Sequence, residues 1–301
     1  MKLRTVQTYF KQLSDESQST PLTQNARCQL RMHAMVEGLG PNFKIHLKVD
    51  TGMHRQGFLI SELENVCKTL KNSEVVIEGV FTHFASAEDL TSNQTHQQLA
   101  CFREALRQIE AAGLRPRFVH AANSAGIALW PESWGNMVRP GILLYGHLPF
   151  FTLREGDDAA APPRALPVKP ALALRARIIS LKDFPAGAAL GYGARFRTTR
   201  PSRIAVIPVG YVDGLPRALS GRVSVIVRNG LAPVVGTISM DLAIVDVTDV
   251  AGVRLDDEVT LIGNSGSLSI AITDWARTLG TVASDLYTQI GARVPRRYQG
   301  G

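Results

Sequence analysis

The sequence predicts an α/β segment followed by a β-rich domain. Residues 44–146 alternate short β-branched runs with helical stretches, an order that is typical of a parallel sheet. Residues 171–301 instead contain many short apolar runs and little helical pattern. Residues 152–170 are rich in proline, alanine and charge, and we expect a linker or surface loop there. The predicted domains are therefore 1–43, 44–151 and 171–301, with 152–170 between the last two.

The first 43 residues are the least patterned part of the chain. A helix over residues 23–37, from Thr23 to Glu37, is expected, with the Thr23 hydroxyl as its N-terminal cap. The polar stretch at 14–20 interrupts any regular pattern before it. We therefore expect one helix in this segment and no larger element.

Four runs in the α/β segment are predicted strands, and one long helix lies among them. The helix, Ser92 to Ala112, places apolar side chains on one face and ends at Gly113, a usual C-terminal position for glycine. Its apolar residues are Leu99, Phe102, Leu106 and Ile109. The predicted strands are residues 44–49, 76–84, 117–122 and 141–146.

The C-terminal domain is predicted to be almost entirely β-structure. Asn229-Gly230 between two of the apolar runs indicates a hairpin turn. A single helix over about 270–279 is expected to interrupt the strands. The predicted strands are ALRARIISL, RIAVIPV, RVSVIV, APVVGTI, LAIVDVT and EVTLI.

Composition limits the classes of protein to which the chain can belong. With 301 residues, 45% of them hydrophobic and 20% charged, it can bury one or two substantial cores and is not a disordered, collagen-like or disulfide-stapled protein. Cys28, Cys67 and Cys101 form no close-spaced pair, which fits a reduced, cytoplasmic setting. The first ten residues lack a signal-peptide core, and the most apolar stretch, 141–153, is too short to span a membrane.

The net charge of +7 raises the question of a nucleic-acid partner. Most of the 33 basic residues are arginines, and they are scattered along the chain rather than clustered. No aromatic-and-basic pattern accompanies them, whereas a nucleic-acid footprint requires clustering. We therefore expect no nucleic-acid partner. No membrane partner and no metal site are expected either.

Eight separate segments, in register, resemble the alanine racemases from residue 44 to the C-terminus. The resemblance implies an incomplete (β/α)8 TIM-type barrel followed by a C-terminal β-rich domain, because four predicted strands stand where a complete barrel has eight. It also implies pyridoxal 5'-phosphate as cofactor. The segments are KVDTGMHRQGF (48–58), FTHFASAED (81–89), HAANSAG (120–126), MVRPGILLYG (137–146), LGYGARF (190–196), PVGYVDG (208–214), VVGTISMD (234–241) and RVPRRY (293–298).

The resemblance implies a cofactor phosphate site in two of these segments. In such barrels phosphate often binds at the loops after the last two strands. By resemblance, the residues at Asn123 and Ser124 and the backbone amides of Gly141 and Ile142 would hold the phosphate, since glycine permits close approach and backbone amides bind anions.

Arg139 is the residue that the family places opposite the pyridine nitrogen of the cofactor. A guanidinium stays protonated up to about pH 12, so it donates a hydrogen bond to that nitrogen without protonating it. The ring then withdraws electrons less strongly, which suits racemisation and disfavours transamination. The resemblance therefore assigns Arg139 to both the cofactor and the chemistry.

Tyr192 aligns with the family's tyrosine acid/base. Racemisation needs one group to take the Cα proton and another to deliver a proton to the opposite face. A phenol has an ordinary pKa of about 10 and must be helped to ionise near neutral pH. By resemblance His83, paired with Arg139, relays to this tyrosine, and Tyr192 comes from the other subunit of a homodimer.

The resemblance also implies a substrate site. Arg55 would contact the substrate carboxylate or the phenolic oxygen of the cofactor, with Lys48 beside it as a residue often found carbamylated. The backbone near Met240 would meet the substrate carboxylate. Tyr211 and Asp241 would line the entry.

Two departures from the family pattern stand out. The cofactor-binding lysine of the family lies in a pattern like VKADAYGHG, and this sequence holds no such pattern; Lys2 and Lys11 stand in unrelated sequence. Some members also place a phosphate-contacting tyrosine just before RVPR, where this chain has Gly291 and Ala292, with Tyr287 nearby.

The resemblance thus implies an isomerase, alanine racemase, that interconverts L-alanine and D-alanine by two-base proton transfer with pyridoxal phosphate and supplies D-alanine for peptidoglycan. The missing lysine pattern favours a truncated chain. Two alternatives stay open. The chain is inactive and serves only as a dimerisation partner, or it is a related racemase acting on another amino acid such as serine.

Overall fold

The computed structural model describes residues 44–153 and 166–299. Its contacts divide the chain into two units, Met1–Arg139 with Phe150–Ala165, and Pro140–Pro149 with Leu166–Gly301. The helix expected over 23–37 lies outside the described residues. Within the described ranges, no helix combines the length and the apolar character that crossing a bilayer requires.

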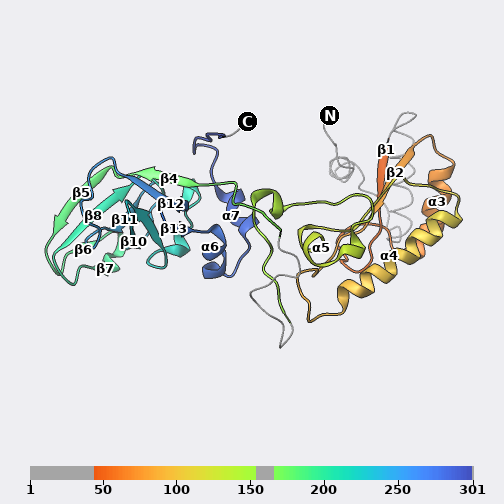
Figure 1. The fold of residues 1–301 in the computed structure, drawn as a ribbon, viewed down its shortest axis with the longest axis horizontal. Coiled ribbons are helices and arrows are strands. Elements are labelled where there is room, and N and C mark those ends of the chain that lie inside the picture. Colours follow the sequence, from red (N-terminus) through yellow and green to blue (C-terminus); the bar gives the residue numbers. More distant parts are fainter. Residues whose placement is uncertain (1–43, 154–165, 300–301) are drawn as a thin grey trace, which may run out of the picture. The chain divides into compact units, whose positions relative to one another are not determined.

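The first unit contains a parallel sheet in the order β1-β2-β3, in which each strand is followed by helical structure (Figure 1). This is the predicted β/α alternation. The strands are β1 (Lys44–Lys48), β2 (Val76–Phe81) and β3 (Phe118–His120). The helical elements are η1 (Ile60–Glu62), α3 (Leu63–Lys71), α4 (Gln94–Ala111), α5 (Ser124–Leu129) and η2 (Pro131–Ser133).

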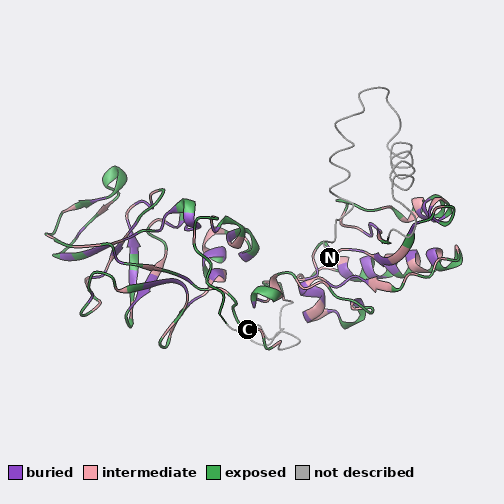
Figure 2. Ribbon diagram, turned by 90° about the horizontal axis from the view of Figure 1, so that it is seen from above, coloured by how far each residue is buried: buried purple, intermediate pink, exposed green. Residues whose placement is uncertain are grey.

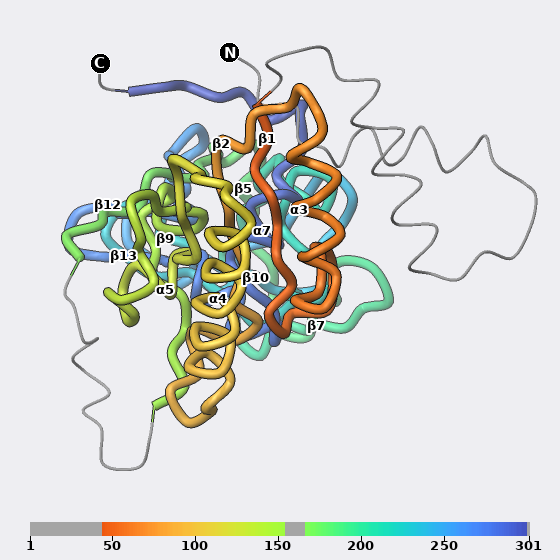
Figure 3. The backbone as a smooth tube through the Cα atoms, turned by 90° about the vertical axis from the view of Figure 1, so that its right-hand side faces the viewer, coloured from red at the N-terminus to blue at the C-terminus, as the bar shows by residue number. Residues whose placement is uncertain are grey.

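Helix α4 confirms the predicted long helix. Leu99, Phe102 and Ile109 are buried, because their spacing places them on the face that packs into the core of this unit. Gly113, at φ +81°, follows the end of the helix and donates its N–H to the carbonyl of Glu110. Helices α3 and α4 contact each other, and Figure 3 shows both helices near β1.

The prediction of a fourth strand at residues 141–146 is wrong. Residues Ile142–Tyr145 form a 3-10 helix, η3, between Gly141 at φ −105° and ψ −92° and Gly146 at φ +78°. The segment closes on itself, with the N–H of His147 donating to the carbonyl of Ile142 at 3.3 Å. Ile142 packs against the core of the second unit, so the apolar run reflects burial there and not pairing in the first sheet.

The second unit is built on a sheet in the order β13-β12-β9-β10-β11-β8-β5, with β4 paired to β12 and a separate β6-β7 hairpin. The purple strand residues in Figure 2 form its buried core. Each apolar run predicted for this domain contains a strand. The strands are β4 (Leu174–Arg177), β5 (Ser180–Phe184), β6 (Ala189–Leu190), β7 (Phe196–Arg197), β8 (Ser202–Ile207), β9 (Ser224–Val227), β10 (Gly230–Val235), β11 (Ala243–Asp246), β12 (Glu258–Ser265) and β13 (Leu268–Ile270).

Two details of this unit differ from the prediction. The hairpin between β9 and β10 is present, but Gly230 already pairs with Val227, so the turn is Arg228-Asn229, with Arg228 at φ +53°. The described residues also hold two α-helices where one was predicted, α6 (Ile272–Leu279) and α7 (Ala283–Gln289). The second has only seven residues, too few for a periodic pattern to stand out in the sequence.

Candidate functional site

The carboxyl ends of the three parallel strands bring the first group of site residues together. Lys48 ends β1, His83 follows β2 by two residues, and Ala121 follows β3 directly. Since parallel strands end at the same edge of a sheet, the loops after them converge. Arg139, although far along the chain, reaches this edge and donates its own N–H to the carbonyl of Ala122.

The guanidinium of Arg139 is held by backbone carbonyls at this edge. Its Nη2 donates to the carbonyls of Thr82 at 2.7 Å and Ala121 at 2.9 Å, and its Nη1 donates to the carbonyl of His120 at 3.2 Å. Its other partners are imidazoles, Nδ1 of His120 at 2.5 Å and Nδ1 of His83 at 3.3 Å. Burial lowers the pKa of Arg139 to about 10, so the group stays charged near neutral pH.

His83 makes the predicted contact with Arg139, and the contact fixes where the imidazole holds its proton. A guanidinium only donates, so Nδ1 of His83 accepts and the neutral ring carries its proton on Nε2. Burial, followed by the charges of Arg139, Arg55 and Lys48, lowers the pKa of His83 to about 4. The ring is therefore neutral at physiological pH and presents an N–H donor on its far side.

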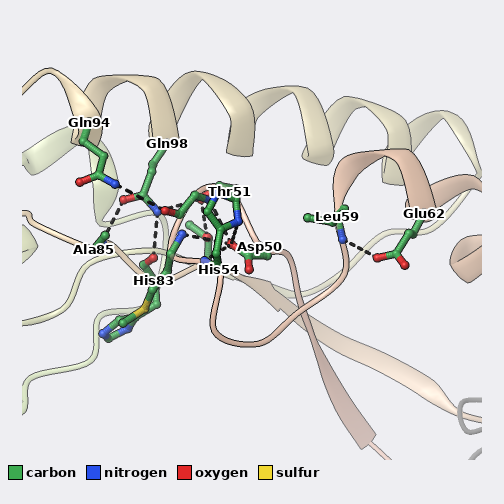
Figure 4. A network of polar contacts seen from close by, with 12 residues as sticks. Asp50, Thr51, His54, Leu59, Glu62, His83, Ala85, Gln94 and Gln98 are labelled. Carbon is green, nitrogen blue, oxygen red and sulfur yellow. Dashed lines mark hydrogen bonds and ion pairs between the residues drawn. The ribbon is translucent and has the colours of Figure 1, made fainter. Parts of the chain in front are cut away.

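A buried polar network fixes the loops after β1 and β2 (Figure 4). The hydroxyls of Thr51 and Thr82 share a hydrogen bond of 2.7 Å. The amide of Gln98, on α4, donates to the carbonyl of His83 at 3.0 Å and to the Thr51 hydroxyl at 3.3 Å, and its oxygen accepts from the N–H of Ala85 at 2.9 Å. One buried side chain thus ties both strand ends to α4.

Arg55 stands in the loop after β1, whose shape is set by Asp50. One oxygen of that carboxylate accepts the backbone N–H groups of Gly52, Met53 and His54 at 3.0, 3.1 and 3.0 Å. Arg55 itself is exposed. Burial, and next to it the charge of Arg55, lowers the pKa of Lys48.

The four expected phosphate residues fall into two pairs, one in each unit. Asn123 caps α5 by accepting the N–H of Gly126 at 2.9 Å, and buried Ser124 begins that helix. Gly141 precedes η3, and Ile142 begins it. Each pair therefore stands at the start of a helical turn.

Tyr192 lies at the tip of the β6-β7 hairpin in the second unit. It stands between Gly191 at φ +68° and Gly193 at φ +69°, backbone angles that glycine adopts without strain. Its side chain is exposed, with a relative accessibility of 71%. The Thr237 hydroxyl donates to its carbonyl at 3.3 Å, which joins the hairpin to the loop that leads to Met240.

Tyr211, Met240 and Asp241 come together on two adjoining loops of the second unit. The N–H of Tyr211 donates to the carbonyl of Ser239 at 3.1 Å, and the N–H of Val212 donates to that of Met240 at 3.2 Å. Arg293 joins the loops. Its guanidinium contacts both oxygens of buried Asp213 at 2.7 and 3.0 Å and Asp241 at 2.6 Å.

Tyr287, which precedes Gly291 in the chain, contacts residues of a distant segment. Its hydroxyl pairs with Nε2 of His147 at 2.6 Å, and its ring stacks on Tyr145, so it contacts the segment that contains η3. Burial raises the pKa of Tyr287 to about 12. Gly291 has no room for a side chain, since a Cβ there would lie 2.4 Å from the Val212 carbonyl.

Sequence reasoning missed three residues of these networks, His120, Gln98 and Arg293. His120 and Arg293 stand inside two of the eight family-like segments, yet nothing in their local pattern indicates partners far along the chain. Gln98 lies on the polar-to-apolar boundary of α4, where an amide is ordinary. A paired carboxylate cannot be inferred for Arg293 from spacing alone, because Asp213 is 80 residues away.

Comparison with known proteins places the chain among alanine racemases. Residues 8–149 match the family model for the alanine racemase N-terminal domain, and residues 171–298 match the C-terminal domain. The alanine racemase of Syntrophobacter fumaroxidans is 38% identical over 272 residues, which are 90% of this chain and 70% of that protein. That of Symbiobacterium thermophilum is 42% identical over 265 residues, 87% of this chain and 67% of that protein.

Solved structures agree with the sequence comparisons. The alanine racemase from D-cycloserine-producing Streptomyces lavendulae superposes with a TM-score of 0.80 at 32% identity, covering 91% of this chain and 71% of that one. The enzyme from Bacillus anthracis with bound L-Ala-P gives 0.80 at 31% identity, covering 90% and 69%. The fold is therefore that of the alanine racemases, a TIM-like barrel portion followed by a β domain.

Proposed function

Because the chain belongs to the alanine racemase family, we propose that it acts as a pyridoxal-phosphate-dependent isomerase that interconverts L-alanine and D-alanine. The observation that carries the proposal is the setting of Arg139. A permanently charged guanidinium is held at the carboxyl ends of parallel strands by three carbonyls and two neutral imidazoles, and no described carboxylate pairs with it. Burying an uncompensated cation costs free energy, so such a site favours an electron-rich ligand.

Pyridoxal phosphate fits the residues on these grounds. Its pyridine nitrogen is an acceptor that suits the donor Arg139, and its phosphate suits helix-start amides such as those near Asn123, Ser124, Gly141 and Ile142. When bound, this cofactor makes the Cα proton of an amino acid acidic. Arg139 would hold the ring nitrogen as a donor that keeps its own proton, since its pKa of about 10 lies well above neutral pH.

Tyr192 and His83 would handle the proton. With Nδ1 of His83 accepting from Arg139, the Nε2–H is left as a donor that can stabilise a phenolate. Tyr192, exposed at a hairpin tip, would be offered to the site of a second copy of the chain, so the active form would be a homodimer. The phenolate would take or return the Cα proton on one face of the substrate.

The substrate carboxylate would meet Arg55 and the backbone near Met240, while Tyr211 and Asp241 would line the entry. Support for Arg55 comes from its position in the rigid loop that Asp50 holds after β1. The lowered pKa of Lys48 makes its neutral amine more available, which supports carbamylation at that side chain. Alanine needs no further pocket, since its side chain is one methyl group.

The test separates the activity of the family from the contribution of this chain. The full chain is assayed for D-alanine formation with pyridoxal phosphate, alone and fused to a segment carrying the family's lysine pattern. We expect activity in the fusion, and activity about 10²–10⁴-fold lower in Tyr192→Phe, because one acid/base group supplies about that factor in rate. Tyr298→Phe, at an exposed tyrosine outside the site, is the matched control. Fusion activity that survives in Tyr192→Phe would overturn the assignment.

Borohydride reduction supplies a second readout. The lysines of the sequence stand outside the family pattern, so reduction of the chain with pyridoxal phosphate should leave every lysine peptide at its unmodified mass. In the fusion, one peptide should gain the mass of the reduced cofactor. Racemisation by the chain alone, together with a labelled lysine, would show that another lysine performs this task.

A further inference from the structure

A line of hydrogen bonds leads from Arg139 away from the proposed cofactor site. Nη1 of Arg139 contacts Nδ1 of His120 at 2.5 Å, and Nε2 of His120 contacts Nδ1 of His46 at 2.8 Å. Nε2 of His46 faces Oε2 of Glu78 at 4.0 Å. The line thus runs across all three strands of the first sheet and ends at a carboxylate.

Donor and acceptor roles along this line permit only one order. A guanidinium has no acceptor, so Nδ1 of His120 must accept, and the neutral ring then carries its proton on Nε2. That N–H must be received by Nδ1 of His46, which places the His46 proton on Nε2, toward Glu78. Burial, followed by the charge of Arg139 and by His46, lowers the pKa of His120 to about 3, which keeps this ring neutral.

The sheet is shaped to hold the His46 ring in this line. The register of β1 against β2 shifts between Ile45 and His46, which sets His46 opposite Gly79. A Cβ at Gly79 would lie 2.5 Å from Nδ1 of His46, although the backbone there is not in a left-handed conformation. Glycine is therefore required at this strand position by the imidazole and not by its own backbone.

Aromatic rings clamp both imidazoles on their faces. Phe81 stacks on His120 with centroids 4.9 Å apart and planes within 7°, and Phe118 stacks on His46 at 6.0 Å. Arg139 also lies over Phe81, 5.2 Å from its centroid. Stacking leaves each imidazole only in-plane contacts, which are the nitrogen atoms used in the line.

We propose that His46 is a positioning residue for Arg139, acting through the proton arrangement of His120, with Glu78 as the carboxylate at the end of the line. His46 holds the Nε2–H form of His120, and that form alone offers Arg139 an acceptor. The hydrogen bond from Lys44 lowers the pKa of Glu78, so the carboxylate stays ionised and attracts the His46 proton. The importance of Arg139 to catalysis rests on the proposed function, but the arrangement itself does not.

The test begins with the unaltered full chain. Nitrogen-15 NMR of histidine-labelled protein at pH 7 should show that both His46 and His120 are protonated on Nε2 and unprotonated on Nδ1. A His120 that carries its proton on Nδ1 would overturn the proposal outright, whether or not any variant folds. The measurement needs no cofactor and no turnover, so it tests the proton arrangement even if the chain shows no racemase activity.

Variants at His46 then test the link to Arg139. His46→Leu removes the acceptor for His120, whereas His46→Asn keeps an acceptor near the position of Nδ1. We expect side-chain N–H exchange of Arg139 to be about tenfold faster in His46→Leu, equivalent to about 1.4 kcal/mol, because His120 is no longer held in the form that accepts from the guanidinium. His46→Asn should restore the slow exchange.

The matched control is His96→Leu, at an exposed histidine on α4 whose ring makes an edge-to-face contact with Trp130. It should leave the exchange at Arg139 unchanged. Equal exchange in His46→Leu and the unaltered chain would show that His120 holds its proton without His46. Equal acceleration in His46→Leu and His46→Asn would show that ring packing, and not the acceptor, positions Arg139.

Discussion

The side-chain amide of Gln98 spans the gap between helix α4 and the carbonyl of His83, to which it donates a hydrogen bond of 3.0 Å. Its oxygen accepts the N–H of Ala85 at 2.9 Å. Both ends of this buried amide are therefore used, and the loop that carries His83 is fastened to the helix at two points two residues apart.

Gln98→Leu should destabilise the chain by about 1–3 kcal/mol, because the apolar side chain leaves the half-buried His83 carbonyl without its donor. The N–H of Ala85 loses its acceptor as well, but Ala85 is exposed and water replaces the lost partner. Denaturant unfolding measures the change. Gln97→Leu, next to it on α4 but exposed, is the control and should change stability by less than about 0.5 kcal/mol. Equal losses in the two variants would contradict the role of the amide.

The stability of the first unit should decrease as the pH falls below about 6.5, the ordinary pKa of histidine. Burial and the charge of Arg139 lower the pKa of His83 to about 4 and of His120 to about 3. Between these values and 6.5 the unfolded chain binds protons that the folded chain does not. The free energy of unfolding therefore decreases as the pH decreases, by up to about 1.4 kcal/mol per pH unit for each proton.

Amide hydrogen exchange in β2 and β3, followed from pH 8 to pH 4, reports this loss. His120→Asn removes one of the two protons and should flatten the slope, whereas His96→Gln, at an exposed histidine, should not. A stability that stays constant from pH 6.5 to pH 4.5 would mean that the two imidazoles titrate in the folded chain as they do in the unfolded one.

Arg293→Lys should loosen the loops of Tyr211 and Met240. The planar guanidinium holds Asp213 through both Nε and Nη2 and reaches Asp241 through the same Nη2, and an ammonium on a single nitrogen cannot reproduce that geometry. We expect the amides of Tyr211 and Val212 to exchange about tenfold faster, corresponding to about 1.4 kcal/mol. Arg297→Lys, at an exposed arginine nearby in the chain, is the control. Unchanged exchange would assign the loop geometry to backbone contacts alone.

The same cluster should lose stability in acid. Burial by itself would raise the pKa of Asp213, but the hydrogen bonds from Arg293 and the Gly210 N–H outweigh it and lower the pKa overall. A carboxyl with a lowered pKa stabilises the fold above its ordinary value, near 3.8, and loses that effect as pH falls through its folded value. Asp213→Asn should therefore remove this acid-dependent part of the loss, as measured by exchange at Tyr211 between pH 5 and pH 2.

Gly79→Ala should be destabilising by about 1–3 kcal/mol, since the added methyl group would collide with the His46 ring. Combining it with His46→Ala removes the obstacle, so the two changes should be strongly non-additive in a double-mutant cycle. Denaturant unfolding of the four proteins gives the coupling free energy. Additive losses would show that Gly79 is needed for a reason other than the imidazole.

Periodicity and turn chemistry were sufficient to predict α4 and the longer strands of the β domain, but not β6, β7 and β13, which have only two or three residues each. The run at 141–146 misled because an apolar stretch between glycines reads as a strand, whereas its burial comes from a 3-10 turn packed on another core. Helix α7 has seven residues, too few for a helical period to be recognised in the sequence. Local pattern therefore predicts long elements well and fails where tertiary packing decides.

The site was predictable to the extent that its residues lie in recognisable segments. The pairing of His83 with Arg139 was expected from the resemblance and is present in the structure. The contacts of His46 with His120 and of Arg293 with Asp213 join residues 74 and 80 positions apart, and neither spacing nor composition indicates them. Such long-range partners follow only from the register of strands and the meeting of loops.

The two left-handed glycines beside Tyr192 bear on how this hairpin can evolve. Because the backbone angles at the two glycines set the direction of the turn, the exposed arm residues Ala189 and Arg197 can change without redirecting the phenol. Leu190 and Phe196 pack in a small core and cannot change as freely. Variation among descendants of this sequence should therefore occur at the exposed arm positions and avoid the two glycines.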